Sequence, residues 1–302
     1  MKPRERALYS ALPDRPPLLL PEGLRLVVWP IVNLEVWEIE RPMARQVLPA
    51  PTGVPVAPDL ANWSWHEYGM RVGIWRFFAA LDRVQARATL SINAAVVDVY
   101  PRVAAAARER RWEFMGHSDV QMPIHQVADQ RAMIHRALDR LEKFTGKRPL
   151  GWLGPGLTET YETPDLLAEA GIQYVGDWVY DDEPTVIATA HGPLVTLPYT
   201  VELNDIPIAM VQHHHGDVFL KRAIDQFDRL YDEGRQRAKI LSFAIHPYIT
   251  GVPHRIKYLE EFLAYARRYS GVAFWTGEQI LEWYRAAAPP DLGLAVARPQ
   301  RS

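Results

Sequence analysis

The feature that most constrains the fold of this chain is the regular alternation of short apolar segments with longer amphipathic ones. Amphipathic segments with helical spacing lie at 70–83, 96–110, 124–144, 217–234 and 255–269. Strands are predicted around them, at 24–32, 88–94, 112–117, 149–154, 174–178, 194–200, 240–247 and 272–276. This alternation is typical of βαβ units and a parallel sheet. Seven or eight such units in fewer than 290 residues predict a closed or nearly closed (β/α) barrel, with a doubly wound open sheet as the alternative.

The domain organisation follows from the same alternation, because no repeat or low-complexity linker interrupts it. We expect one barrel domain over residues 24–288. Residues 1–23 are rich in proline and are expected to form an extended arm, with packing on a neighbouring subunit as a hypothesis. Residues 289–302 are expected to be a flexible tail.

Composition excludes several classes of function. The net charge is -2, which gives no reason to expect a nucleic-acid or acidic-membrane surface. The chain has no cysteine, so disulfides, thiol catalysis and cysteine-based zinc sites are excluded. No stretch reaches the ~18 apolar residues of a membrane span, and no secretory signal is recognisable. No glycine-rich phosphate motif follows the first strand. We expect a cytoplasmic protein that binds neither nucleic acid nor membrane.

Polar residues at the ends of the predicted strands are the candidate site, because the functional end of a (β/α) barrel is where strands lead into helices. Glu35 follows the first strand, His117 ends the third, Pro155 follows the fourth, and His246 lies near the end of the strand at 240–247. An unpaired carboxylate beside so apolar a strand would be costly, which favours a function for Glu35. A single histidine at a strand end is as often a structural hydrogen-bonding residue. Glu278 also follows a strand, but a role at a helix start explains it better.

The segment "QHHHGD" (212–217) suggests a metal site at first sight. Adjacent histidines on a strand cannot all face one ion, because neighbouring side chains point to opposite faces. We interpret the segment as a loop at a helix entry, from which His214 contacts substrate.

The chain resembles the polysaccharide deacetylase (NodB-homology) superfamily over roughly residues 24–285. Within it, the similarity is greatest to the branch of cofactor-independent allantoinases and cytoplasmic peptidoglycan-deacetylase-like proteins. The motifs occur in family order: "VNLEVW" (32–37), "HEYGMRVGIWR" (66–76), "GHSDVQ" (116–121), "FTGKRPLGWLGP" (144–155), "VYDDEP" (179–184), "TLPYTVELND" (196–205), "FDRLYDEG" (227–234) and "IHPYITGVPHR" (245–255).

The resemblance implies a distorted (β/α)7 barrel. It also locates a metal site, because metal-dependent members hold a divalent ion with an Asp after the first strand and an H-x-x-x-H pair. In this chain Asn33 stands at the Asp position, His117 at the first His and Gln121 at the second. Amide oxygens bind transition metals poorly compared with carboxylate and imidazole. We therefore expect no cofactor, with weak binding of zinc or another divalent metal at His117 as the alternative.

The reaction that the resemblance implies is hydrolysis of a carbon–nitrogen bond. Without metal, water must be activated by a general base, and the leaving nitrogen needs a proton. Glu35 or His117 is the candidate base, and His246 is the acid that the family motif implies. Substrate binding is assigned to five other positions: Asn33, Arg71, Gln121, Pro155 and His214.

Three functions remain open on this reasoning. The first is a hydrolase of a cyclic amide, imide or ureide, and a small ring of this kind suits a metal-free site better than an unactivated acetamide. The second is a metal-dependent deacetylase of an N-acetylated sugar. The third is a pseudoenzyme that only binds carbohydrate or a small molecule. The resemblance also implies a homo-oligomer, since close relatives form tetramers.

Overall fold

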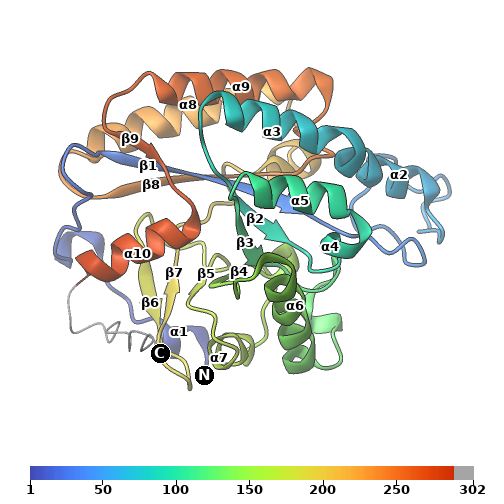
Figure 1. The fold of residues 1–302 in the computed structure, drawn as a ribbon, viewed down its shortest axis with the longest axis horizontal. Helices are drawn as coiled ribbons and strands as arrows, with labels where there is room; N and C mark the ends of the chain where they lie inside the picture. The colour runs from blue at the N-terminus through green and yellow to red at the C-terminus, as the bar shows by residue number, and fades with distance from the viewer. Residues whose placement is uncertain (289–302) are drawn as a thin grey trace.

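The fold is built on a mostly parallel sheet that curls into a distorted barrel (Figure 1). The computed structural model describes residues 1–288, and the predicted tail at 289–302 lies outside the described residues. Seven parallel strands follow one another around the sheet in the order β8-β1-β2-β3-β4-β5-β7. Their bounds are β1 Leu26–Leu34, β2 Thr89–Ile92, β3 Glu113–Gly116, β4 Gly151–Trp152, β5 Tyr174–Val175, β7 Leu194–Thr196 and β8 Lys239–Ile245. The prediction of a distorted (β/α)7 barrel is confirmed.

Two departures distort the barrel. Strand β1 pairs with β9 (Val272–Phe274) along its first half and with β2 along its second half. Strand β6 (Thr185–Ile187), which the apolar pattern did not predict, runs antiparallel on β7. Beyond β7, the chain reaches β8 through single contacts, such as the hydroxyl of Ser242, which donates to the Pro198 carbonyl at 2.6 Å. These contacts bring the two ends of the sheet together.

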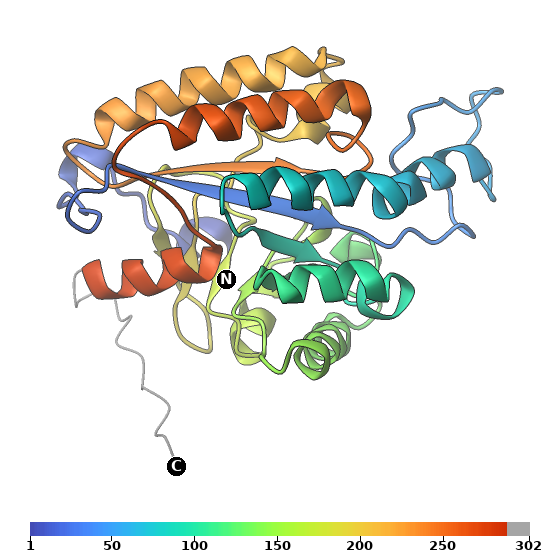
Figure 2. The same ribbon diagram turned by 45° about the horizontal axis from the view of Figure 1, so that its top comes forward.

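Helices surround the sheet, as expected for βαβ units. Figures 1 and 2 show α3, α8 and α9 side by side over β1 and β8, with α5 and α6 beside β2 and β3. The helix bounds are α1 Pro3–Arg6, α2 Leu60–Tyr68, α3 Ile74–Arg83, α4 Val96–Val99, α5 Pro101–Glu109, α6 Gln130–Thr145, α7 Thr163–Glu169, α8 Gly216–Glu233, α9 Pro253–Arg267 and α10 Gly277–Ala287. Shorter turns are η1 Leu12–Asp14, η2 Gly69–Gly73, η3 Ile124–Gln126, η4 Pro155–Leu157 and η5 Ile206–Val211.

Helix boundaries differ from the predicted ones for local reasons. The helix predicted from 124 begins at Gln130, because the carboxylate of Asp129 caps it by accepting a hydrogen bond from the Ala132 amide at 2.9 Å. It ends at Gly146, whose φ of 78° is left-handed and suits glycine. The helix predicted at 70–83 is longer, because α2 runs through a π-turn into α3.

The N-terminal arm lies against the chain's own barrel. The guanidinium of Arg6 is buried, donates to Asp165 Oδ1 at 2.9 Å and also donates to the Ala188 carbonyl at 2.9 Å. Further along, the indole of Trp283 in α10 donates to the Leu19 carbonyl at 3.1 Å. The arm therefore packs on the barrel of its own chain.

The π-turn η2 packs closely on the turn that carries His246. A Cβ added to Gly73 would overlap the carbonyl oxygen of Pro247, and one on Gly69 would lie 2.6 Å from the backbone nitrogen of Tyr248. These are backbone atoms, so no side chain can move aside. The two glycines let α2 and α3 approach the end of β8, and this approach places the turn after β8 against α2.

The Gly73→Ala variant is expected to be less stable by about 1–3 kcal/mol, the usual cost of overpacking. In an unconstrained helix the same substitution would stabilise, since alanine is the better helix former. Gly73 has ordinary helical φ and ψ angles, so the loss would report the clash with Pro247 alone. Urea denaturation measures it, with exposed Val72→Ala as the control. An unchanged midpoint for Gly73→Ala would contradict the packing described.

Candidate active site

Glu35 is the centre of a buried polar cluster at the carboxyl end of β1. It follows the last residue of that strand and is 7% exposed. Its Oε2 accepts hydrogen bonds from the indole of Trp37 and the phenol of Tyr248, both at 3.1 Å. Its Oε1 faces two histidines, with His246 Nε2 at 3.5 Å and His117 Nε2 at 4.0 Å. The barrel thus brings the three predicted catalytic residues, from three different strand ends, to one carboxylate.

His246 is held in a charged environment. Its Nδ1 lies 2.6 Å from Asp205 Oδ1, and its backbone amide donates to the other oxygen of the same carboxylate at 2.8 Å. Burial opposes protonation, but the charges of Asp205 and Glu35 outweigh it and raise the pKa of His246 to about 9. The imidazole is therefore a cation at neutral pH, with Nδ1–H toward Asp205 and Nε2–H toward Glu35.

His117 has the opposite character. Its Nδ1 lies 2.5 Å from the carbonyl oxygen of Leu153, and this oxygen can only accept, so Nδ1 carries the hydrogen. Burial is the largest influence on the pKa of His117 and lowers it, which keeps the ring neutral at pH 7. Its Nε2 is therefore an acceptor, facing Oε1 of Glu35. The site pairs one neutral and one cationic histidine across a single carboxylate.

Glu35 itself is ionised. Burial alone would raise its pKa, but the charge and hydrogen bond of His246 outweigh burial and lower the pKa of Glu35 to about 2. The carboxylate and His246 thus form an ion pair inside the protein. Such a pair is costly to desolvate and is stable only when its other atoms are hydrogen-bonded, as Trp37, Tyr248 and Asp205 provide here.

Amide side chains surround this cluster and are themselves hydrogen-bonded. Asn33 is buried, and its Nδ2 donates to the Ile245 carbonyl at 3.4 Å. Asn93 Nδ2 donates to the carbonyl of His117 and, at 3.4 Å, to Oε1 of Gln121. Asn33 and Gln121 thus lie within the site, at the positions predicted for substrate binding.

A metal fits this arrangement poorly. Among residues 1–288, no group of three or more His, Cys, Asp and Glu side chains is arranged to hold a metal ion. At the family's ligand positions, Asn33 and Gln121 offer neutral amide oxygens in place of a carboxylate and an imidazole, and the Gln121 oxygen already accepts from Asn93. We therefore assign no catalytic step to a metal.

Two residues predicted to bind substrate lie apart from the cluster. Arg71 is exposed on η2, and His214 is exposed before α8, where its backbone amide donates to Ile208. Within residues 1–288, neither side chain has a hydrogen bond or ion pair to a site residue. His215, rather than His214, lines a small cavity of about 20 Å³ with Asp205. The structure does not bring Arg71 and His214 to Glu35, and their substrate-binding role stays a prediction.

Pro155 takes a different position, close behind the site. It is buried and opens η4, two residues after Leu153, whose carbonyl orients His117. Its own carbonyl accepts a hydrogen bond from the Thr158 hydroxyl at 2.8 Å. The turn at Pro155 therefore supports the chain segment that holds His117.

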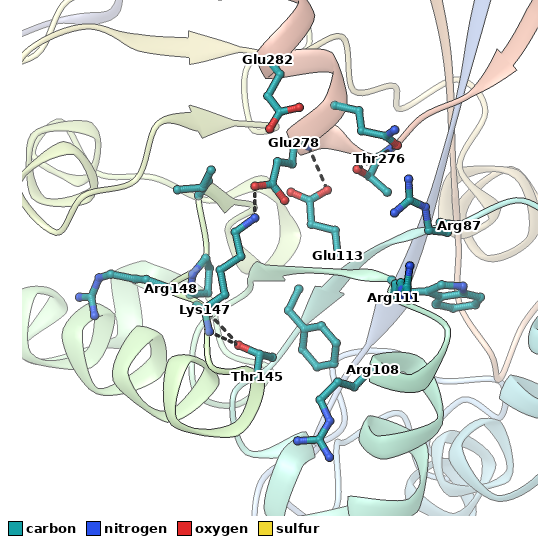
Figure 3. Close-up of a pocket in the computed structure, with 15 residues that line it drawn as sticks. Arg87, Arg108, Arg111, Glu113, Thr145, Lys147, Arg148, Thr276, Glu278 and Glu282 are labelled. Atoms are coloured by element: carbon teal, nitrogen blue, oxygen red, sulfur yellow. Dashed lines mark hydrogen bonds and ion pairs between the residues drawn. The ribbon is translucent and has the colours of Figure 1, made fainter. Parts of the chain in front are cut away.

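Glu278 lies elsewhere, in the first turn of α10, as its helix-start explanation predicted. It pairs with Lys147, and its backbone amide donates to Oε2 of Glu113 at 3.1 Å. These groups line a cavity of about 460 Å³ beside the amino-terminal end of β3. Figure 3 shows Lys147, Glu113 and Glu278 among the residues that line it. Since Glu35 and His117 follow the carboxyl ends of their strands, this cavity lies at the opposite end of the barrel.

Four residues of the site were missed by sequence reasoning: Trp37, Tyr248, Asp205 and His66, whose ring packs on those of Trp37 and Tyr248. Tyr248 and Trp37 each lie two residues after a predicted catalytic residue. This two-residue spacing was the only sequence signal for them. Asp205 lies 41 residues before His246. No local pattern connects two residues that far apart, and only the arrangement of the strands makes them neighbours.

Comparison with known proteins places this site in context. No protein-family model matches the chain. A Schizosaccharomyces pombe protein named "Putative polysaccharide deacetylase" is 27% identical over 245 residues, covering 75% of this chain and 77% of that protein. The structure of a "probable Polysaccharide deacetylase" from Pseudomonas aeruginosa PAO1 is 28% identical with a TM-score of 0.81, covering 91% of this chain and 96% of the other. The structure of the allantoinase PuuE is 26% identical with a TM-score of 0.82, with the same coverage of 91% and 96%.

These similarities confirm the resemblance to the polysaccharide deacetylases and allantoinases drawn from the sequence motifs. The two structural similarities each cover 91% of the chain. Separately, none of the helices in residues 1–288 is long and apolar enough to cross a membrane.

Proposed function

We propose that the chain is a hydrolase of carbon–nitrogen bonds other than peptide bonds, and that it opens a cyclic amide, imide or ureide without a metal. The observation that carries the proposal is the Glu35 carboxylate between a neutral and a cationic histidine. Base and acid are thus available together, as amide hydrolysis requires. The similarity to proteins named as deacetylases and as an allantoinase supports the same reaction class.

The attacking water binds between Glu35 and His117 in this mechanism. Both Oε1 of Glu35 and Nε2 of His117 accept hydrogen bonds, and they are 4.0 Å apart. A water that donates one hydrogen to each at about 2.8 Å fits between two acceptors at this separation. His117 is the better base of the two, because the low pKa of Glu35 leaves that carboxylate weakly basic. Glu35 orients the water and stabilises the imidazolium that forms.

His246 then supplies the proton to the leaving nitrogen. In its cationic form, the Nε2–H of His246 points toward Oε1 of Glu35, which lies between the two histidines. Asp205 holds the other side of the ring through Nδ1. As the carbonyl is attacked, its oxygen becomes negative and needs a hydrogen-bond donor. The amides of Asn33 and Gln121 are the donors for it in this cluster. Burial keeps the pKa of Tyr248 well above its ordinary value, so its phenol stays protonated and keeps its hydrogen bond to Glu35.

Burial of the site favours a small ring over a polysaccharide chain. Glu35, His117 and His246 are 7%, 2% and 5% exposed. A small ring can be enclosed in such a site, and water exclusion then strengthens every charge interaction around it. The imides and ureides also have a more reactive carbonyl and a less basic leaving nitrogen than an acetamido sugar, which suits a site without a Lewis acid.

A metal-dependent deacetylase of N-acetylated sugars is the second candidate, because two of the proteins compared are named as polysaccharide deacetylases. The two candidates differ in what a chelator would do. A pseudoenzyme, the third candidate, would turn over neither class of substrate.

Exhaustive treatment with EDTA is expected to leave the rate on hydantoins, cyclic imides or allantoin within about twofold of the untreated enzyme. The reason is that His117 and His246 already supply base and acid. The measurement is steady-state hydrolysis of these rings and of chitooligosaccharides, before and after chelation and after addition of Zn²⁺ or Mn²⁺. Loss of activity with EDTA and its recovery with either ion would overturn the metal-free mechanism.

A further inference from the structure

His66, in α2, is the one histidine packed against the site that the mechanism does not use. It is 4% exposed. Its ring lies among three aromatic side chains, with centroid distances of 4.3 Å to Tyr248, 4.5 Å to Trp37 and 5.1 Å to Trp65. Tyr248 and Trp37 are the two residues that donate to Oε2 of Glu35. His66 is therefore one ring away from the central carboxylate.

The hydrogen bond of His66 defines its tautomer. Nδ1 lies 2.7 Å from the carbonyl oxygen of Asn62, one helical turn earlier. A carbonyl oxygen only accepts, so the hydrogen is on Nδ1. Burial lowers the pKa of His66 to about 4, so the ring is neutral at pH 7. Nε2 is then a lone-pair acceptor on the side of the ring away from the helix backbone.

This acceptor has no partner. Nε2 of His66 is buried and makes no hydrogen bond with any of residues 1–288. A buried acceptor without a donor has lost its hydrogen bonds to water with nothing in return, and native proteins keep few of them. None of the three aromatic rings around it donates to Nε2: the Trp37 indole and the Tyr248 phenol donate to Glu35, and no hydrogen bond joins the Trp65 indole to it. A donor from outside the described chain, on a ligand or a water molecule, would satisfy it.

We propose that Nε2 of His66 accepts a hydrogen bond from a ring N–H of the substrate and so determines specificity for unsubstituted rings. The inference rests on the proposed function, because a cyclic imide or ureide carries such an N–H beside its carbonyl. Nε2 of neutral His66 carries no hydrogen, so it selects a donor on the ligand rather than a carbonyl or carboxylate oxygen. The ligand class is therefore a small ring with a free N–H, and rings alkylated at that nitrogen are rejected.

The test compares matched substrates that differ only at nitrogen: succinimide with N-methylsuccinimide, and hydantoin with its 1-methyl and 3-methyl derivatives. The wild-type protein is expected to prefer the free N–H ring by about 10- to 100-fold or more in kcat/KM, after correction for the alkaline hydrolysis rates. His66→Phe keeps an aromatic ring and removes the acceptor. It is expected to lose most of this preference, mainly by slowing the N–H substrate.

Two further measurements make the outcome decisive. His66→Gln, whose amide oxygen can accept, is expected to recover part of the preference, which a purely structural role would not explain. Activity on the N-methyl ring reports whether His66→Phe is correctly folded. If His66→Phe keeps the wild-type preference, the inference is wrong while the proposed function stands.

Absence of turnover on every ring would instead count against the proposed function. Calorimetric binding of the same substrate pairs then tests the inference without catalysis. Equal affinities of the wild-type protein for N–H and N-methyl rings, or no binding of either, would overturn it.

Discussion

Replacement of His246 by alanine is expected to lower kcat by about 10²–10⁴-fold, the usual contribution of a positioned general acid. With His117 neutral, the imidazolium of His246 is the only cation within 4 Å of Glu35 in the described part of the chain. Without it, the leaving nitrogen has no proton donor and the Glu35 carboxylate has no counter-charge. Single-turnover hydrolysis of a cyclic imide or ureide measures the loss, because it isolates the chemical step from product release.

A matched control lies eight residues further along the chain. His254 is exposed on the first turn of α9, and its alanine variant is expected to keep the wild-type rate. Thermal melting of both variants separates a catalytic loss from a folding loss. A fully active His246→Ala variant would show that His246 is not the general acid.

The Asp205→Asn variant is expected to lose about 10²-fold or more in kcat/KM and to change the pH profile. The reason is that the Asp205 charge raises the pKa of His246 to about 9 against the effect of burial. A general acid must be protonated, so wild-type activity should persist up to about pH 9 and fall as the pH rises through that value. Removing the charge lowers the pKa of His246, so the alkaline fall should move to lower pH.

The direction of this shift is what tests the assignment. An acidic displacement of the alkaline limb, measured as kcat/KM against pH, identifies His246 as the acid that Asp205 controls. Loss of rate with an unchanged profile would instead assign Asp205 a role in folding of the turn, since its Oδ2 also accepts from Thr250 at 2.7 Å. Thr250→Val tests that second role separately, because it removes this bond and keeps the carboxylate.

The barrel and three of its functional residues could be predicted from the sequence for a physical reason. Strands buried on both faces appear as apolar runs, and β1 is buried along all nine of its residues. A polar residue directly after such a run lies at the carboxyl end of a strand, which is why Glu35, His117 and His246 were found. Strand β6 was missed because two of its three residues are half-exposed, so it lacks that apolar pattern.

The protonation states could not be predicted in this way, and they are what the chemistry depends on. His117 and His246 are equivalent in sequence, since each follows a buried strand. Burial keeps His117 neutral while the carbonyl of Leu153 fixes its tautomer, and the carboxylate of Asp205 helps to make His246 cationic. Both partners come from other strands or from the segments that follow them, and their effects depend on burial and on distances of a few ångströms.

Hydrophobic periodicity is a local property of the chain. The sequence alone was therefore sufficient to predict the order of strands and helices along the chain. It was also sufficient to predict the end of the barrel at which polar residues gather. Electrostatic environment is a property of neighbours in space. The contact of His66 with Tyr248, the pairing of Asp205 with His246 and the separation of Arg71 from the cluster all depend on how the barrel closes. Only the tertiary structure decided which of the polar residues act on one another.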